Sequence, residues 1–183
     1  IDFPDLQFVF TPASYTEGMI GKLQDHPGIT CGVWQSRPQS RGYIRATSDN
    51  IKIDPIIQPN YLKEKIDQDI LIEGVKMCRK LLKTSNIEKI SVKETLPGEQ
   101  VKTDNEILNF VRNNGATVYH AIGSCRMGID QYAVVNPSLK ILGLENIRVA
   151  DASIMPSMPS GNTNAATLMI AEKASDLIKK DLN

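Results

Sequence analysis

Apolar and polar residues alternate in the first part of the chain, which is the pattern of strands with one buried face. Residues 6–11 (LQFVFT) alternate regularly, and residues 29–36 (ITCGVWQS) repeat the pattern more loosely. Strand character returns over residues 43–47, after a turn-like RPQSRG stretch. These segments predict strands joined by turns and loops.

The pattern then changes to a period of 3.6, which predicts a long amphipathic helix over residues 64–84. Its apolar face consists of Leu71, Val75, Cys78 and Leu82, widened by Ile70, Gly74, Met77 and Leu81. A shorter helix is expected after residue 103 and should end near residues 114–115. Thr103 suits its N-cap and Glu106 its third position, which together form a capping box.

The last third of the chain predicts a short extended piece, a strand, a loop and a helix. Residues 139–142 suit an extended segment, and residues 147–150 (IRVA) suit a buried strand. A loop rich in Pro, Ser and Gly separates this strand from a helix over residues 163–180, whose apolar residues cover much of its surface. Strand, loop and helix in this order are typical of a nucleotide-binding layer, where ligands lie at helix N-termini.

Composition changes this picture little, because it is that of an ordinary globular protein. The 183 residues carry 21 Lys and Arg against 21 Asp and Glu, so no basic excess indicates a nucleic-acid partner. No apolar run approaches the roughly 20 residues that a transmembrane helix needs. The first residues lack both an initiator Met and the features of a signal peptide. We therefore expect a piece of a longer chain, located in the cytoplasm, either free or peripheral to a membrane.

The three cysteines and two histidines show no spacing typical of a metal site. Cys31, Cys78 and Cys125 are far apart in sequence and odd in number, so reduced thiols are the simplest interpretation. We expect no metal centre.

The candidate chemistry lies in the segment YHAIGSCRMG at 119–128 and in the segment SGNTN at 160–164. His120 stands among small residues and can act as a base near neutral pH. Asn162 can donate a hydrogen bond to an oxygen that becomes negatively charged, although an amide cannot accept a proton at this pH. The two side chains suggest a base and an amide partner directed at one reacting hydroxyl.

Six segments, in order along the chain, resemble the C-terminal part of the glucose–methanol–choline (GMC) flavin oxidoreductases. They are RPQSRGYIR at 37–45, IQPNYL at 57–62, residues 119–128, VVNP at 134–137, residues 147–156 and residues 161–173. The resemblance is greatest to the choline dehydrogenase and alcohol dehydrogenase-like branch. The family usually has Thr at position 124 and often Asp at position 136, where this chain has Ser124 and Asn136.

The resemblance implies a mixed α/β fold in which residues 1–118 supply an antiparallel sheet with flanking helices on the substrate-binding side. Residues 119–128 would be the active-site segment at the seam, and residues 129–183 a strand and helix that return to the FAD-binding domain. The family's N-terminal Gly-rich FAD-binding half is absent from this sequence, and no GxGxxG motif occurs in it.

The resemblance also implies FAD-dependent oxidation of a primary alcohol, choline-like, to an aldehyde by proton abstraction and hydride transfer to flavin N5. His120 would be the base and Asn162 the second catalytic residue. Asp151 and Ala152 would contact the ribityl and phosphate part of FAD, and the backbone at Asn162 and Thr163 the flavin ring. The partners would be the missing N-terminal half, a small alcohol, and quinone or oxygen as electron acceptor.

The sequence is compatible with several alternatives. The same fold hosts lyases in which FAD has no redox role, and the chain could also be inactive alone. Arg37 and Arg41 fit either an anionic substrate or, as we favour, a structural ion pair. His26 fits a surface loop, Cys125 a small buried residue and Trp34 the core.

Overall fold

The computed structural model describes residues 3–16 and 21–182 and divides into two compact units. The first contains Ile1–Arg41 and Asn60–Val118, and the second contains Gly42–Pro59 and Tyr119–Asn183. Small antiparallel sheets and helices make up both, so the mixed α/β class expected from the sequence is confirmed.

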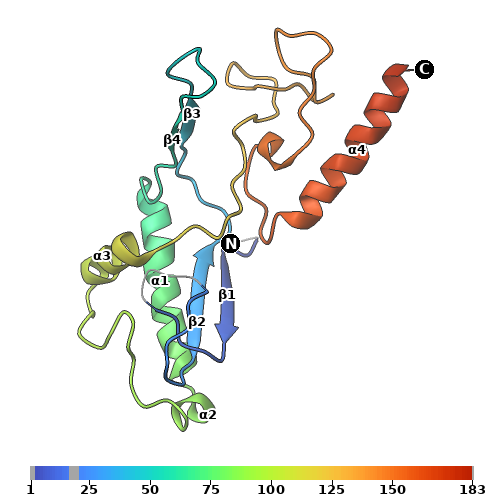
Figure 1. The fold of residues 1–183 in the computed structure, drawn as a ribbon. Helices are drawn as coiled ribbons and strands as arrows, with labels where there is room; N and C mark the ends of the chain where they lie inside the picture. Colours follow the sequence, from blue (N-terminus) through green and yellow to red (C-terminus); the bar gives the residue numbers. More distant parts are fainter. Residues whose placement is uncertain (1–2, 17–20, 183) are drawn as a thin grey trace. The chain divides into compact units, whose positions relative to one another are not determined.

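A two-stranded antiparallel sheet forms one side of the first unit (Figure 1). Strand β1 (Leu6–Thr11) pairs along its whole length with β2 (Thr30–Gln35), from Leu6 opposite Gln35 to Thr11 opposite Thr30. Both strands lie where the alternating pattern predicted them.

Helix α1 (Lys65–Leu82) lies along this sheet and confirms the long amphipathic helix. The structure gives it two contact faces in place of the one wide stripe that the sequence indicated. Gly74 and Cys78 on one face meet β2, while Ile72 on the other packs into a core with helix α3. Met77, which the sequence placed on the inner side, is 47% exposed, because it lies on neither face.

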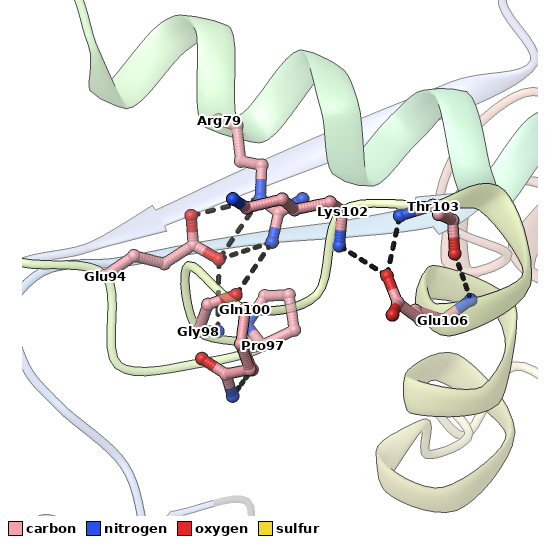
Figure 2. A network of polar contacts seen from close by, with 8 residues as sticks. All are labelled: Arg79, Glu94, Pro97, Gly98, Gln100, Lys102, Thr103 and Glu106. Carbon is pink, nitrogen blue, oxygen red and sulfur yellow. Dashed lines mark hydrogen bonds and ion pairs between the residues drawn. The ribbon is translucent and has the colours of Figure 1, made fainter.

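Helix α3 (Asp104–Asn114) begins at the predicted capping box (Figure 2). The N–H of Glu106 donates to Oγ1 of Thr103 at 3.3 Å, and the N–H of Thr103 donates to Oε2 of Glu106 at 2.8 Å. These bonds satisfy N–H groups that a helix start otherwise leaves unpaired. Ile107, which is fully buried, fixes the helix against α1.

The segment between α1 and α3 contains the short helix α2 (Ser85–Glu88) and is held to α1 by Arg79. The guanidinium of Arg79 contacts both carboxylate oxygens of Glu94 and donates to the carbonyl oxygen of Gly98 at 3.1 Å (Figure 2). A planar fork of this kind fixes the orientation of both partners.

A buried carboxylate ties the turn after β2 to the start of α1. Asp67 is 1% exposed and accepts hydrogen bonds from the N–H groups of Gln39 and Ser40, from the Ser40 hydroxyl and from the Gln35 amide. Arg41, in the same turn, donates to the carbonyl oxygens of Pro38 and Ser40, and it has no acidic partner among residues 3–16 and 21–182. The ion pair that we favoured for Arg41 is therefore wrong, while Arg37 lies over the ring of Phe3, 4.6 Å from its centre.

The second unit contains less regular structure. Strands β3 (Tyr43–Arg45) and β4 (Ile56–Gln58) form a small antiparallel hairpin, a 3-10 turn η1 covers Ala152–Ile154, and helix α4 covers Asn164–Leu182. One apolar core joins the loops to both η1 and α4. Its buried members are Val135, Leu139, Ile154, Met155, Ile170 and Ala174.

Two expectations for this unit differ from the structure. Residues 147–150 form no strand: Arg148 makes a single bridge with Lys140, and Ile147 is 47% exposed. Within the described residues, the pairing of Arg148 with Lys140 does not extend into a run of paired residues, so no strand forms. Helix α4 is present where expected, but it buries only Ile170 and Ala174, while Leu168 is 60% exposed.

Candidate active site

The segment that carries His120 begins with a strained backbone and continues through a tight turn. Tyr119 has φ of 61°, a conformation that costs a residue other than glycine about 1–2 kcal/mol. Gly123 has φ of 82°, and a Cβ there would lie 3.3 Å from the carbonyl oxygen of Met155. The chain direction on either side of His120 is thus set by two unusual backbone conformations.

Main-chain hydrogen bonds join this segment to η1. The N–H of Cys125 donates to the carbonyl oxygen of Ser153 at 3.0 Å, and the N–H of Met127 donates to that of Ile154 at 2.8 Å. Ile122 packs against the core to which Ile154 belongs. Two of the motifs found in the sequence, 119–128 and 147–156, therefore lie side by side.

Asp151 is the residue that starts η1. Its carboxylate accepts a hydrogen bond from the N–H of Ser153 at 2.7 Å. The hydrogen bonds from the Ser153 hydroxyl and N–H hold the pKa of Asp151 below its ordinary value. The side chain is exposed and ionised at neutral pH, and Ala152 beside it is half-buried.

The third motif leads into α4. Thr163 accepts the first hydrogen bond of the helix, from the N–H of Thr167 at 2.9 Å, and the Thr167 hydroxyl bonds to the same oxygen. The unpaired N–H groups of the first turn give this end of the helix a partial positive charge. Helix α4 packs against η1, and Ile170 shares the core with Ile154.

The segment that contains His120 and the helix that follows Asn162 thus both contact one element, η1, within one unit. His120 is half-buried, whereas Asn162 is exposed just before the helix. Around Gly161 the chain leaves open space, since a Cβ there would have no neighbour within 4 Å. A flat ligand could approach the backbone closely at this point.

Other residues singled out in the sequence are placed elsewhere. His26 is exposed in a loop, as expected, with Nδ1 3.1 Å from the carbonyl oxygen of Pro27. Cys125 and Trp34, expected as a small buried residue and a core residue, are both half-buried. Within the described residues, no group of three or more His, Cys, Asp or Glu side chains could hold a metal ion.

Sequence reasoning missed Tyr119 and Ser153. The strain at Tyr119 has no signal in the sequence, because tyrosine gives no preference for a positive φ. The role of Ser153 could have been found, since an Asp two residues before a Ser is a common local cap.

Comparison with known proteins identifies the family. Residues 38–171 match the GMC oxidoreductase family, and this range covers more than half of the chain. The chain belongs to the GMC oxidoreductases. The matched range contains four of the six motifs found in the sequence and overlaps the other two, at 37–45 and 161–173.

Among curated proteins, this GMC chain is 42% identical to alcohol dehydrogenase [acceptor] of Pseudomonas putida over 182 residues. The match covers 100% of the chain and 33% of that protein. It is 41% identical to mitochondrial choline dehydrogenase of Homo sapiens, covering 98% of the chain and 30% of that protein. The chain therefore spans about a third of the length of these relatives.

Solved structures show the same fold. Pyridoxine 4-oxidase from Mesorbium loti superposes with a TM-score of 0.85 at 28% identity, covering 94% of this chain and 34% of that one. An FAD-dependent oxidoreductase from Chaetomium thermophilum gives a TM-score of 0.79 at 27% identity, covering 84% of this chain and 27% of that one. No helix within residues 3–16 and 21–182 combines the length and apolarity needed to span a membrane.

Proposed function

We propose that this protein oxidises a primary alcohol, choline-like, to the aldehyde, with FAD as the hydride acceptor and quinone or oxygen as the final electron acceptor. The observation that carries the proposal is the attachment of the His120 segment and of α4 to the same short turn, η1. That arrangement occurs in a chain that is more than 40% identical to an alcohol dehydrogenase and a choline dehydrogenase.

The residues present fit FAD. The open space beside Gly161 admits a planar ring, and the N–H groups at the start of α4 suit an electron-rich edge of such a ring. Asp151 offers an exposed carboxylate that can accept hydrogen bonds from hydroxyl groups. When bound, FAD supplies the acceptor for the hydride at its N5 atom.

His120 is the base in this proposal. Removing the hydroxyl proton makes the alcohol carbon a better hydride donor, and an imidazole titrates close to neutral pH. A ring nitrogen of His120 accepts that proton. The half-buried position of His120 leaves part of the residue accessible.

Asn162 supports the same step by a different interaction. Its amide N–H donates to the substrate oxygen as negative charge develops there, which stabilises the alkoxide. An amide cannot compete for the proton, so the proton goes to His120. We assign FAD contacts to Asp151, Ala152, Asn162 and Thr163.

We further assign residues 1–118 to substrate binding and residues 129–183 to FAD binding. Two of the relatives, a choline dehydrogenase and an oxygen-dependent choline dehydrogenase, support the choline-like substrate. Other primary alcohols are the next candidates, because a further relative is an alcohol dehydrogenase.

The test is anaerobic mixing of the intact flavin-containing protein with choline or with a short primary alcohol. We expect one of these alcohols to bleach the flavin absorbance, because the hydride has no other acceptor. A lyase with a non-redox flavin would instead cleave a cyanohydrin and leave the absorbance unchanged with every alcohol. That second result would exclude the proposed oxidation.

A further inference from the structure

Two cysteine thiols meet inside the first unit, although 46 residues separate them in sequence. Sγ of Cys31 on β2 lies 3.5 Å from Sγ of Cys78 on α1, and the Cys31 thiol donates to the Cys78 sulfur. A disulfide requires about 2.05 Å between the two sulfur atoms. The thiols are therefore in van der Waals contact and need only a small approach to bond.

The local sequence explains this closeness. Cys31 and Val33 point to one face of β2, and Gly74 and Cys78 lie one turn apart on α1. A Cβ at position 74 would lie 2.9 Å from Cγ2 of Val33, so glycine is what allows the helix to lie this close to the strand. Figure 1 shows α1 running along β2 over this region.

The Cys31 side of the pair is open to small molecules. A hollow of about 250 Å³ borders on Cys31 and is lined mostly by apolar side chains, including Phe8, Phe10 and Leu82. Cys31 is half-buried, whereas Cys78 is buried. A small neutral oxidant can reach Cys31 first.

We propose that Cys31 and Cys78 form an oxidation-sensitive dithiol that a hydroperoxide converts into a disulfide joining β2 to α1. In the first step, the sulfur of Cys31 attacks hydrogen peroxide, the O–O bond breaks, and Cys31 sulfenic acid and water form. In the second step, the sulfur of Cys78 attacks the sulfenic sulfur, the S–O bond breaks, and a second water leaves with the proton of Cys78. Two thiols lose two electrons, and one peroxide gains them.

Burial makes the second step the slow one. Desolvation, followed by the hydrogen bond with Cys31, raises the pKa of the Cys78 thiol to about 12, so very little thiolate is present at neutral pH. The reduced pair is therefore stable to brief exposure, and the disulfide accumulates only under sustained oxidant. Once formed, it closes a loop of nearly fifty residues and restricts the unfolded chain.

The test is a peptide map of the intact protein after incubation with hydrogen peroxide, alkylation and tryptic digestion without reductant. We expect residues 23–41, which carry Cys31, to be linked to residues 77–79, which carry Cys78. The linked mass should disappear on reduction. Peroxide treatment should also raise the Tm by roughly 5–10 °C, and a reductant should reverse this rise.

Two variants and an internal standard make the test decisive. Cys125→Ser should keep the linked peptide, and Cys31→Ser should lose both the link and the Tm rise. Oxidation of glutathione in the same tube shows that the peroxide is active. The peptide map of the wild-type protein therefore tests the proposal even if Cys31→Ser folds poorly. The proposal would be overturned if Cys31 and Cys78 were both still free thiols after the glutathione is fully oxidised. It would also be overturned if either cysteine were linked to Cys125.

Discussion

At the scale of single residues, Asp67 shows how hydrogen bonds from neutral groups can stabilise a buried carboxylate. Burial alone would raise the pKa of this carboxyl group, but the hydrogen bonds from Gln39, Ser40 and Gln35 outweigh that effect and lower it. The carboxylate also sits in the first turn of α1, where the helix dipole favours negative charge. Asp67 thereby holds the turn after β2 in place.

Asp67→Asn should lower the free energy of unfolding by about 2–3 kcal/mol, because the amide can accept at only one of its two ends. Urea unfolding at pH 7 measures this loss. The matched control is Asp69→Asn, two residues along the same helix, where the carboxylate is exposed and only small changes are expected. Equal losses in both variants would contradict the role given to Asp67.

Asp67 should also make the free energy of unfolding depend on pH. A carboxyl group whose pKa is lower in the folded state adds stability above its unfolded pKa of about 3.9, and this stability is lost as the pH falls through the folded pKa. Wild-type protein should therefore lose stability below about pH 4 more steeply than Asp67→Asn does. Parallel acid unfolding curves for the two proteins would show that another group is responsible.

Asp67 also marks a limit of what the sequence could predict. An acidic residue near a helix start is usually a surface residue, and nothing in residues 64–70 indicates burial. Its partners come from a turn more than 25 residues earlier, so only the fold brings them together. The candidate segment around His120, which stays a prediction, could by contrast be proposed from the sequence because its residues are contiguous.

At the scale of elements, the close contact of α1 with β2 depends on Gly74. Glycine inside a helix is usually unfavourable by up to about 1 kcal/mol relative to alanine. Here a methyl group would meet Val33 at 2.9 Å and Leu6 at 3.3 Å, and the β-branched valine has little freedom to move away. Packing therefore outweighs helix propensity at this position.

Gly74→Ala should consequently destabilise the protein by about 1 kcal/mol, although the same change in an exposed helix would stabilise it. Thermal unfolding monitored by circular dichroism measures the effect. Met77→Ala, on the exposed side of α1, serves as the control and should change the Tm little. A higher Tm for Gly74→Ala would show that α1 is free to move away from β2.

The elements themselves differed in how far the sequence determined them. The ranges of α1, α3 and α4 were predicted within a few residues, because helical periodicity and the Thr103 cap are local properties. Residues 147–150 have strand composition but form only a bridge, because a strand also needs a paired neighbour. The exposure of Met77 could not be predicted either, because it depends on which faces of α1 find partners.

At the scale of the whole molecule, each of the two units has its own apolar core. The core of the first unit centres on Ile107, between α1 and α3, and the core of the second centres on Val135 and Ile154. All the residues proposed for catalysis and FAD binding belong to the second unit, in which loops are fixed by that core and by η1. Their positions thus depend on packing more than on regular secondary structure.

The base assigned at His120 is tested most directly by the rate at which alcohol bleaches the flavin in a stopped-flow experiment without oxygen. His120→Ala should slow this reaction at least about a hundredfold, on the scale of lost acid–base catalysis, while the flavin content stays that of the wild type. His26→Ala, which removes the exposed loop histidine, should leave the rate unchanged. A wild-type rate in His120→Ala with bound flavin would contradict the assignment of His120 as the base.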